Sequence, residues 1–228
     1  MDLPKIDNSN LWDKTYNVLK DKIIRRGFNP NQKLSIQELA EQLGVSRTPI
    51  RDALNRLETE GLIRTISKVG TFVRAIDVND VIDIMDTRLM LEFWVVDKLH
   101  TLSKHELNEA IRKMEDILEQ TSKLIETPSL NSFLDADYNL KFHIEFIKLG
   151  KNKNNIDIYQ KVMEYRFLAM ESSLISKDMV LTAIEQHSSI VDALKEGEIT
   201  RLKYLIKVHL DDSKEKLIDK IQKNGGTI

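Results

Sequence analysis

The chain has 228 residues, 41% of them hydrophobic and 31% charged, a balance typical of a folded protein rather than a disordered one. With only 8 glycines and 4 prolines, it is too poor in turn residues for an all-β fold. The absence of cysteine excludes disulfides, so any metal site must use histidine and oxygen ligands. No apolar run reaches the length of about 18 residues that a membrane span needs, and the acidic start is unlike a secretory signal, so we expect a cytoplasmic protein.

Charge is unevenly distributed along the chain. Residues 1–75 contain 13 Lys and Arg against 9 Asp and Glu, a net charge of +4, and the remainder carries −6. A basic amino-terminal third joined to an acidic remainder favours a segment that binds a polyanion, followed by a domain with another role.

The amino-terminal third predicts three short helices. In the first, which Gly27 ends, one face is expected to be buried: Leu11, Val18, Leu19 and Ile23. The second begins at Ser35, which is placed to cap it together with Glu38, and it ends at Gly44. The third, SRTPIRDALNRLETEG, begins at Ser46, carries a buried stripe of Ile50, Ala53, Leu54 and Leu57, and ends at Gly61. The run LIRTISKVGTFVRAI then predicts a β-hairpin.

Two helices joined by a tight turn and followed by a hairpin predict a winged helix-turn-helix. Arg47 and Arg51 lie four residues apart, so both project from the polar face of the third helix. A helix in the major groove reads bases near its amino terminus, where arginine pairs with guanine O6 and N7. The hydroxyls of Ser46 and Thr48 can reach phosphates. Lys68 at the wing tip can contact the DNA backbone or minor groove.

The segment LAEQLGVSRTPIRDALNRLETEGLI, followed by a V-G-T-F-V wing, resembles the GntR family of bacterial regulators over about residues 10–75. The resemblance implies an operator-reading domain over 1–76. It implies that the third helix and the wing contact DNA through Ser46, Arg47, Thr48, Arg51, Lys68, Gly70 and Thr71. We also expect contacts from Ser35 and Gln37, at the start of the second helix. Several relatives have a basic residue where this chain has Gln37, so that contact is expected to differ.

From about Asp77 onward the pattern predicts an all-α helical bundle over 77–228. Six amphipathic helices are expected, near 78–101, 103–126, 130–149, 154–174, 178–196 and 198–223. Three of them each carry one histidine on an apolar face: His143, His187 and His209. A single inward histidine is more often a hydrogen-bonded core residue, but three on separate helices make a site for Zn²⁺, Ni²⁺ or a similar cation an equal alternative.

The helical region resembles the FCD ligand-binding domain of FadR-like regulators over about residues 78–222. In many members an Asp-x-x-x-His pair and two further histidines hold a metal that receives the carboxylate of an organic acid. The resemblance therefore implies metal ligands at Asn139, His143, His187 and His209. Asn139 stands where the family usually has aspartate, and Asp135 lies one turn earlier as a substitute.

A carboxylate effector needs cationic partners. Arg88 and Arg166 both align with apolar faces, where an unpaired charge is costly. Each can bind the effector or pair with an internal acid, as Arg88 can with Glu92 at i+4.

Together these features predict a homodimeric repressor or activator that binds double-stranded operator DNA and responds to a small carboxylate. Two alternatives stay open. One is a metal-free regulator that senses a bulkier ligand such as an acyl-CoA. The other is a histidine-metal enzyme with an appended DNA module, although no general base or nucleophile motif accompanies the histidines.

Overall fold

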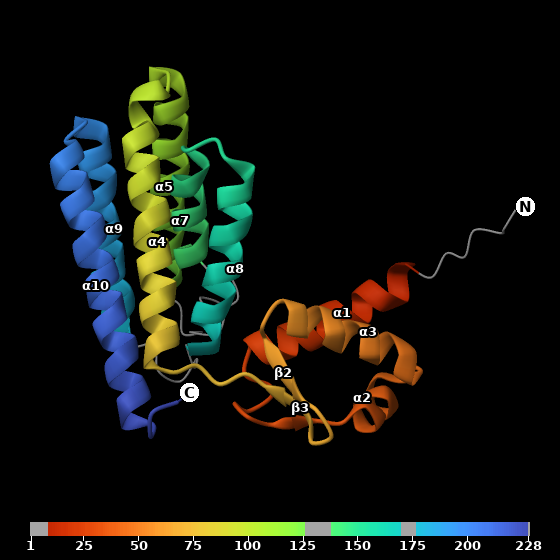
Figure 1. Cartoon of the computed structure of the whole chain (residues 1–228). Helices are drawn as coiled ribbons and strands as arrows, with labels where there is room; N and C mark the ends of the chain where they lie inside the picture. Colours follow the sequence, from red (N-terminus) through yellow and green to blue (C-terminus); the bar gives the residue numbers. More distant parts are fainter. Residues whose placement is uncertain (1–8, 126–137, 170–176, 228) are drawn as a thin grey trace, which may run out of the picture. The chain divides into compact units, whose positions relative to one another are not determined.

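The protein is described by a computed structural model, which covers residues 9–125, 138–169 and 177–227 (Figure 1). It has two compact units: the first ends at Ile76, and the second runs from Asp77 to Gly226. Among the described residues, no helix is both long enough and apolar enough to cross a membrane.

The first unit is a winged helix-turn-helix, as predicted. Its helices are α1 (Ser9–Ile24), α2 (Ile36–Leu43) and α3 (Arg47–Thr59), and both α1 and α2 pack against α3. The Ser35 hydroxyl accepts a hydrogen bond from the Glu38 backbone N–H (3.3 Å) and so caps α2. Gly44 then takes the left-handed conformation (φ 64°) that lets the chain turn sharply into α3.

The wing is the hairpin of β2 (Ile63–Ile66) and β3 (Gly70–Val73), joined by a tight turn in which Lys68 has a positive φ of 62°. A third strand, β1 (Lys33–Leu34), was not predicted from the sequence. It pairs antiparallel with β3, which gives the sheet order β1-β3-β2. A two-residue strand carries no periodic pattern, and its partner lies almost forty residues away, so local sequence gives no signal for it.

The predicted buried face of α1 was partly wrong. Leu19 and Ile23 are buried, but Leu11 and Val18 are 46% and 49% exposed. The contact with α3 is filled instead by Tyr16, which is 7% exposed and lies on a face rotated from the predicted one. The helix also ends at Ile24, a few residues before the predicted glycine stop.

The second unit is a bundle of long helices, as predicted. Their bounds are α4 (Val78–Lys98), the 3₁₀ turn η1 (Leu99–Thr101), α5 (Lys104–Ile125), α7 (Tyr138–Lys148), α8 (Lys153–Ala169), α9 (Lys177–Glu196) and α10 (Ile199–Lys223). Helix α4 packs against α7, α8 and α10, and α5 packs against α7 and α9 (Figure 1). The expected start of the 130–149 helix and end of the 154–174 helix lie outside the described residues.

Gly150, just after α7, lies directly against the indole ring of Trp94 on α4. A β-carbon at this position would overlap the six-membered ring. We therefore expect Gly150→Ala to lower the free energy of unfolding by about 1–3 kcal/mol, because the added methyl group fits only if the Trp94 ring shifts. Urea unfolding followed by circular dichroism measures this change.

The matched background for this test is Trp94→Leu, which removes the ring. In that background Gly150→Ala is expected to cost little, since residues in contact couple in double-mutant cycles. An equal loss in both backgrounds would contradict the proposed overlap.

Candidate functional site

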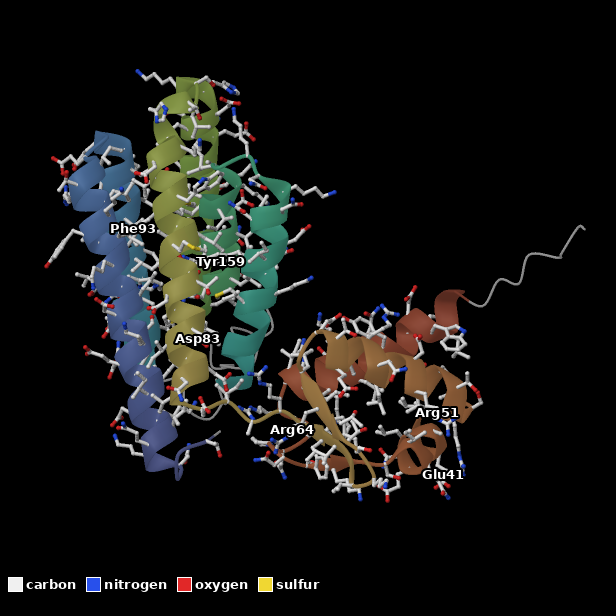
Figure 2. The ribbon with its side chains drawn as sticks, viewed as in Figure 1. Glu41, Arg51, Arg64, Asp83, Phe93 and Tyr159 are labelled. Atoms are coloured by element: carbon white, nitrogen blue, oxygen red, sulfur yellow. The ribbon has the colours of Figure 1, made fainter. Side chains whose placement is uncertain are left out.

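Helix α3 separates apolar and polar residues by face. The residues expected to read DNA are exposed: Ser46, Arg47, Thr48, Arg51 and the flanking Asn55. The opposite stripe is buried, with Ile50, Ala53, Leu54 and Leu57 each 4% exposed or less. Figure 2 shows Arg51 at the surface of the first unit. The helix thus presents two arginines and two hydroxyls along one accessible edge, near its amino terminus.

Ser46 occupies the amino-terminal cap position of α3 with extended backbone angles (φ −70°, ψ 166°), as predicted. Its side chain, however, makes no capping hydrogen bond in the described structure. Ser46 is exposed at the amino terminus of the helix, a position that suits contact with a phosphate oxygen.

Gln37 on α2 contacts the reading helix. Its side-chain carbonyl accepts a long hydrogen bond from Arg47 (3.4 Å), and its amide nitrogen donates to Glu41 (3.1 Å). All three side chains are exposed. A basic residue at position 37 would repel Arg47, whereas glutamine can orient it. The structure therefore gives Gln37 a role as a neighbour of Arg47.

In the wing, two threonine hydroxyls face each other across the hairpin. The hydroxyls of Thr71 and Thr65 lie 3.2 Å apart across the hairpin, and Thr65 also donates to Glu58 of α3. These bonds attach the wing to the reading helix. Lys68 is exposed at the turn, and Gly70 (φ 146°) has the Lys33 side chain directly against it.

In the second unit, three predicted histidines converge. His143 on α7, His187 on α9 and His209 on α10 are 1%, 3% and 2% exposed. Their Nε2 atoms lie 3.2 Å from one another in all three pairs. Among the described residues no cysteine or carboxylate joins this group.

Neighbouring side chains fix the protonation of His143. Its Nε2 lies 3.0 Å from Nη2 of Arg88, and since arginine can only donate, Nε2 accepts. The proton of the ring must then be on Nδ1, which lies 3.3 Å from Oε1 of Glu92. His143 is therefore neutral, and its Nε2 lone pair accepts the hydrogen bond from Arg88.

The same logic applies to His209. Its Nδ1 lies 2.8 Å from the side-chain oxygen of Gln186, which can only accept, so Nδ1 carries the proton and Nε2 has the lone pair. Gln186 is held in turn by donating to Asp212 (3.2 Å). The third ring, His187, stacks on Phe142 with centroids 4.1 Å apart.

The spacing and protonation of the three rings fit a metal ion. Three nitrogens bound to one Zn²⁺ at about 2.0–2.1 Å lie about 3.4 Å apart in tetrahedral geometry and about 2.9 Å apart in octahedral geometry. The observed 3.2 Å falls between these values. Two Nε2 lone pairs that face each other at this distance repel, and a shared cation relieves that repulsion. Metal-bound histidines commonly donate the other N–H to a carboxylate or carbonyl, as His209 does to the side-chain carbonyl of Gln186.

Asn139 lies one helical turn before His143 on α7, on the same face. Its side-chain oxygen is buried and has no hydrogen-bond partner among the described residues. A buried carbonyl oxygen without a partner is costly, so this atom is suited to a ligand. Asp135, the substitute considered for this role, lies outside the described residues.

Arg88 forms a buried network with Glu92 and Tyr159. The guanidinium donates to the Tyr159 hydroxyl (2.9 Å) and to Glu92 (3.5 Å), and the hydroxyl donates to Glu92 (2.6 Å). Burial raises the pKa of Glu92, whereas the charge of Arg88 and the hydrogen bond from Tyr159 lower it. Burial raises the pKa of Tyr159 well above its usual value, which keeps the hydroxyl protonated. Figure 2 shows where Tyr159 lies in the helical bundle.

Comparison with known proteins finds the same two-part organisation. Residues 11–73 match the model for bacterial regulatory proteins of the gntR family, and residues 83–212 match the FCD domain. The chain belongs to the GntR family. Relatives of this family, like the chain itself, are transcription regulators that bind DNA, and not enzymes.

Two relatives of this GntR regulator span nearly the whole chain. The Nta operon transcriptional regulator of Aminobacter aminovorans is 27% identical over 199 residues, 86% of this chain and 89% of that protein. The HTH-type transcriptional repressor GlaR of Escherichia coli is 25% identical over 211 residues, 86% and 90% of the two chains. The crystal structure of a GntR regulator from Rhodococcus sp. RHA1 has the same fold, with a TM-score of 0.73 at 20% identity over 92% of this chain and 99% of that one.

Sequence reasoning missed parts of this GntR regulator's buried site. It did not assign Tyr159 or Gln186, although Gln186 directly precedes His187 and that adjacency was a usable signal. The sequence allowed Arg88 either to form an ion pair or to bind the effector, and the structure shows the ion pair with Glu92. The side chain of Arg166 lies outside the described part of α8. The other two described histidines near the start of the bundle, His100 and His105, are exposed.

Proposed function

We propose that this GntR regulator is a homodimeric repressor whose operator binding is controlled by a small organic acid bound at a divalent metal ion. The convergence of three imidazole Nε2 atoms at 3.2 Å supports the metal and therefore the effector class. A relative named as a repressor supports that sign of regulation.

The DNA-binding half of the proposal rests on α3 and the wing. Arg47 and Arg51 read base edges in the major groove, Ser46 and Thr48 contact phosphates, and Lys68 contacts the backbone or minor groove. A two-fold dimer presents two such helices, so the operator is expected to be a near-palindrome with half-sites about one helical turn or more apart. Binding is expected to weaken steeply with salt, because phosphate contacts release counterions.

In the sensing half, His143, His187 and His209 hold a Zn²⁺ or Ni²⁺ ion with the side-chain oxygen of Asn139. A bound divalent ion supplies positive charge that attracts a carboxylate. Arg88 provides a second cationic group, since its Nη2 already reaches His143 Nε2. To act as a switch, the acid must bind the DNA-competent and DNA-incompetent arrangements with different affinities.

Two measurements test the proposal. Protein purified without chelator is expected to contain about one divalent ion per chain by elemental analysis, and His187→Ala is expected to lose it. Operator titrations with the metal-loaded protein are then repeated with a panel of organic acids, at least one of which is expected to weaken binding. If the wild-type protein contains no divalent metal in stoichiometric amount, the metal-held effector is contradicted. The DNA-binding assignment is not affected by that result.

A further inference from the structure

Lys33 begins β1, the strand that was not predicted from the sequence. Its Cα lies opposite Phe72 of β3 in the antiparallel pair. Just before it, the Asn31 backbone N–H donates to the Val73 carbonyl (3.1 Å), and the Val73 N–H donates to the Gln32 carbonyl (2.9 Å). These bonds hold Lys33 in register with the wing, although the two strands are far apart in the sequence.

Strand alternation places Lys33 on the solvent-facing side of the wing sheet, because successive side chains of a strand point to opposite faces. The next residue, Leu34, is 5% exposed and lies opposite Thr71, whose hydroxyl is beside that of Thr65. Thr65 in turn donates to α3, so this face of the sheet is turned toward the helices. Lys33 lies on the other face with Arg64 of β2, and both side chains are exposed.

The side chain of Lys33 lies against Gly70, at the start of β3. A β-carbon on Gly70 would be 2.6 Å from Cε and 3.3 Å from Nζ of Lys33, so the ammonium group lies beside the backbone next to the turn that joins β2 and β3 (Figure 1). Lys68, in that turn, is only two residues from Gly70. Gly70 is therefore required for two reasons, its φ of 146° and the room it leaves for Lys33.

The turn end of the wing carries positive charge without a matching acid. No described acid forms an ion pair with Lys33 or Lys68, whereas Arg64 on the same face donates to the side-chain oxygen of Asn31 (2.9 Å). The stem of Lys33 is laid along the sheet toward the turn, so its charge adds to that of Lys68 at one end of the wing. Such a concentration of one sign of charge attracts an anion.

We propose that Lys33 binds a phosphate of the DNA backbone beside the wing, as a second cation in addition to Lys68. The inference rests on the proposed contact of Gly70 and the wing with DNA, and it adds a contact from β1. Where the backbone at Gly70 approaches a phosphate, the Lys33 ammonium is at the same place. Lysine binds phosphate as a point charge and reads no base edge, so Lys33 contributes affinity for duplex DNA of any sequence.

The test variant is Lys33→Met, which keeps an unbranched side chain over Gly70 and removes the charge. Each phosphate contact contributes about 0.9 to the slope of log K against log salt on duplex DNA. Lys33→Met is therefore expected to reduce that slope by about 0.9 for each bound chain and, at about 0.15 M salt, to weaken binding about 5-fold per chain. Fluorescence anisotropy over a salt series measures both, on an operator that the wild-type protein selects from random duplexes and on an unrelated duplex of equal length.

Two further variants separate charge from structure. Lys33→Arg restores a cation at the same position and is expected to keep the wild-type slope. Lys14→Gln removes the charge of an exposed lysine of α1 that forms no ion pair with a described acid, and it is expected to change the slope far less. Thermal unfolding followed by circular dichroism verifies that each substitution leaves the fold intact.

The outcomes separate this inference from the proposed function. An unchanged slope in Lys33→Met refutes the phosphate contact, and so does an equal drop in Lys14→Gln, which would show only a diffuse field. A loss confined to the operator overturns the inference as well, because it assigns Lys33 to base reading. If Lys33→Arg loses the slope as Lys33→Met does, charge is not the cause. If the wild-type chain binds no duplex DNA, the proposed function itself fails.

Discussion

Arg51→Ala is expected to weaken binding to the specific operator by about 1–3 kcal/mol, which is about 5- to 150-fold in Kd. Arg51 is exposed on the polar edge of α3, one turn after Arg47, and no described acid neutralises it. A guanidinium paired with guanine O6 and N7 loses two charge-assisted hydrogen bonds when it is truncated. Fluorescence anisotropy with labelled operator at fixed salt measures the change.

The matched control is Arg25→Ala, which removes the same charge from an exposed residue just after α1 that pairs with Asp21. It is expected to have a much smaller effect, since surface charges away from the contact act only through screened, long-range attraction. Arg51→Ala is also expected to leave affinity for unrelated DNA far less changed than affinity for the operator. Equal losses on both DNAs would assign Arg51 to phosphate contact and not to base reading.

The winged helix-turn-helix could be predicted because its signals are local. Gly44 marks a left-handed helix stop, Ser46 starts α3, and the spacing of Arg47 and Arg51 assigns its polar face. The errors came from tertiary contacts. Periodicity on α1 allowed more than one apolar face, and only packing against α3 selects the face with Tyr16 over the one with Val18.

In the buried site, too, local features could be predicted from the sequence and tertiary contacts could not. The sequence placed each histidine on an inward face, because neighbours three and four residues away are apolar. It could not show that His143, His187 and His209 meet at 3.2 Å, since that depends on how three helices pack. Tyr159 was missed for a related reason: its partners, Glu92 and Arg88, lie 67 and 71 residues away in the chain.

The largest stability effect is expected at the buried ion pair. Arg88 and Glu92 have side chains 0% and 1% exposed, and Arg88→Met leaves the Glu92 charge in the interior without its cationic partner. Breaking a buried pair in this way typically costs about 3–5 kcal/mol. Urea unfolding of the chelator-treated protein, followed by circular dichroism, measures the loss of stability without any contribution from bound metal.

The double variant Arg88→Met/Glu92→Gln removes both charges and is expected to recover much of that stability, since replacing both members of a buried pair is often neutral. If the stability lost by the double variant equals the sum of the losses in Arg88→Met and Glu92→Gln, the two charges do not interact. A pair that can be removed with little loss of stability must be explained by another role, and the proposed one is to accept an anion beside the metal. The folded double variant is therefore expected to bind Zn²⁺, but an organic acid that weakens operator binding by the wild-type regulator is expected to have little effect on this variant. A double variant that responds to the acid as fully as the wild-type regulator would show that the anion acts without Arg88.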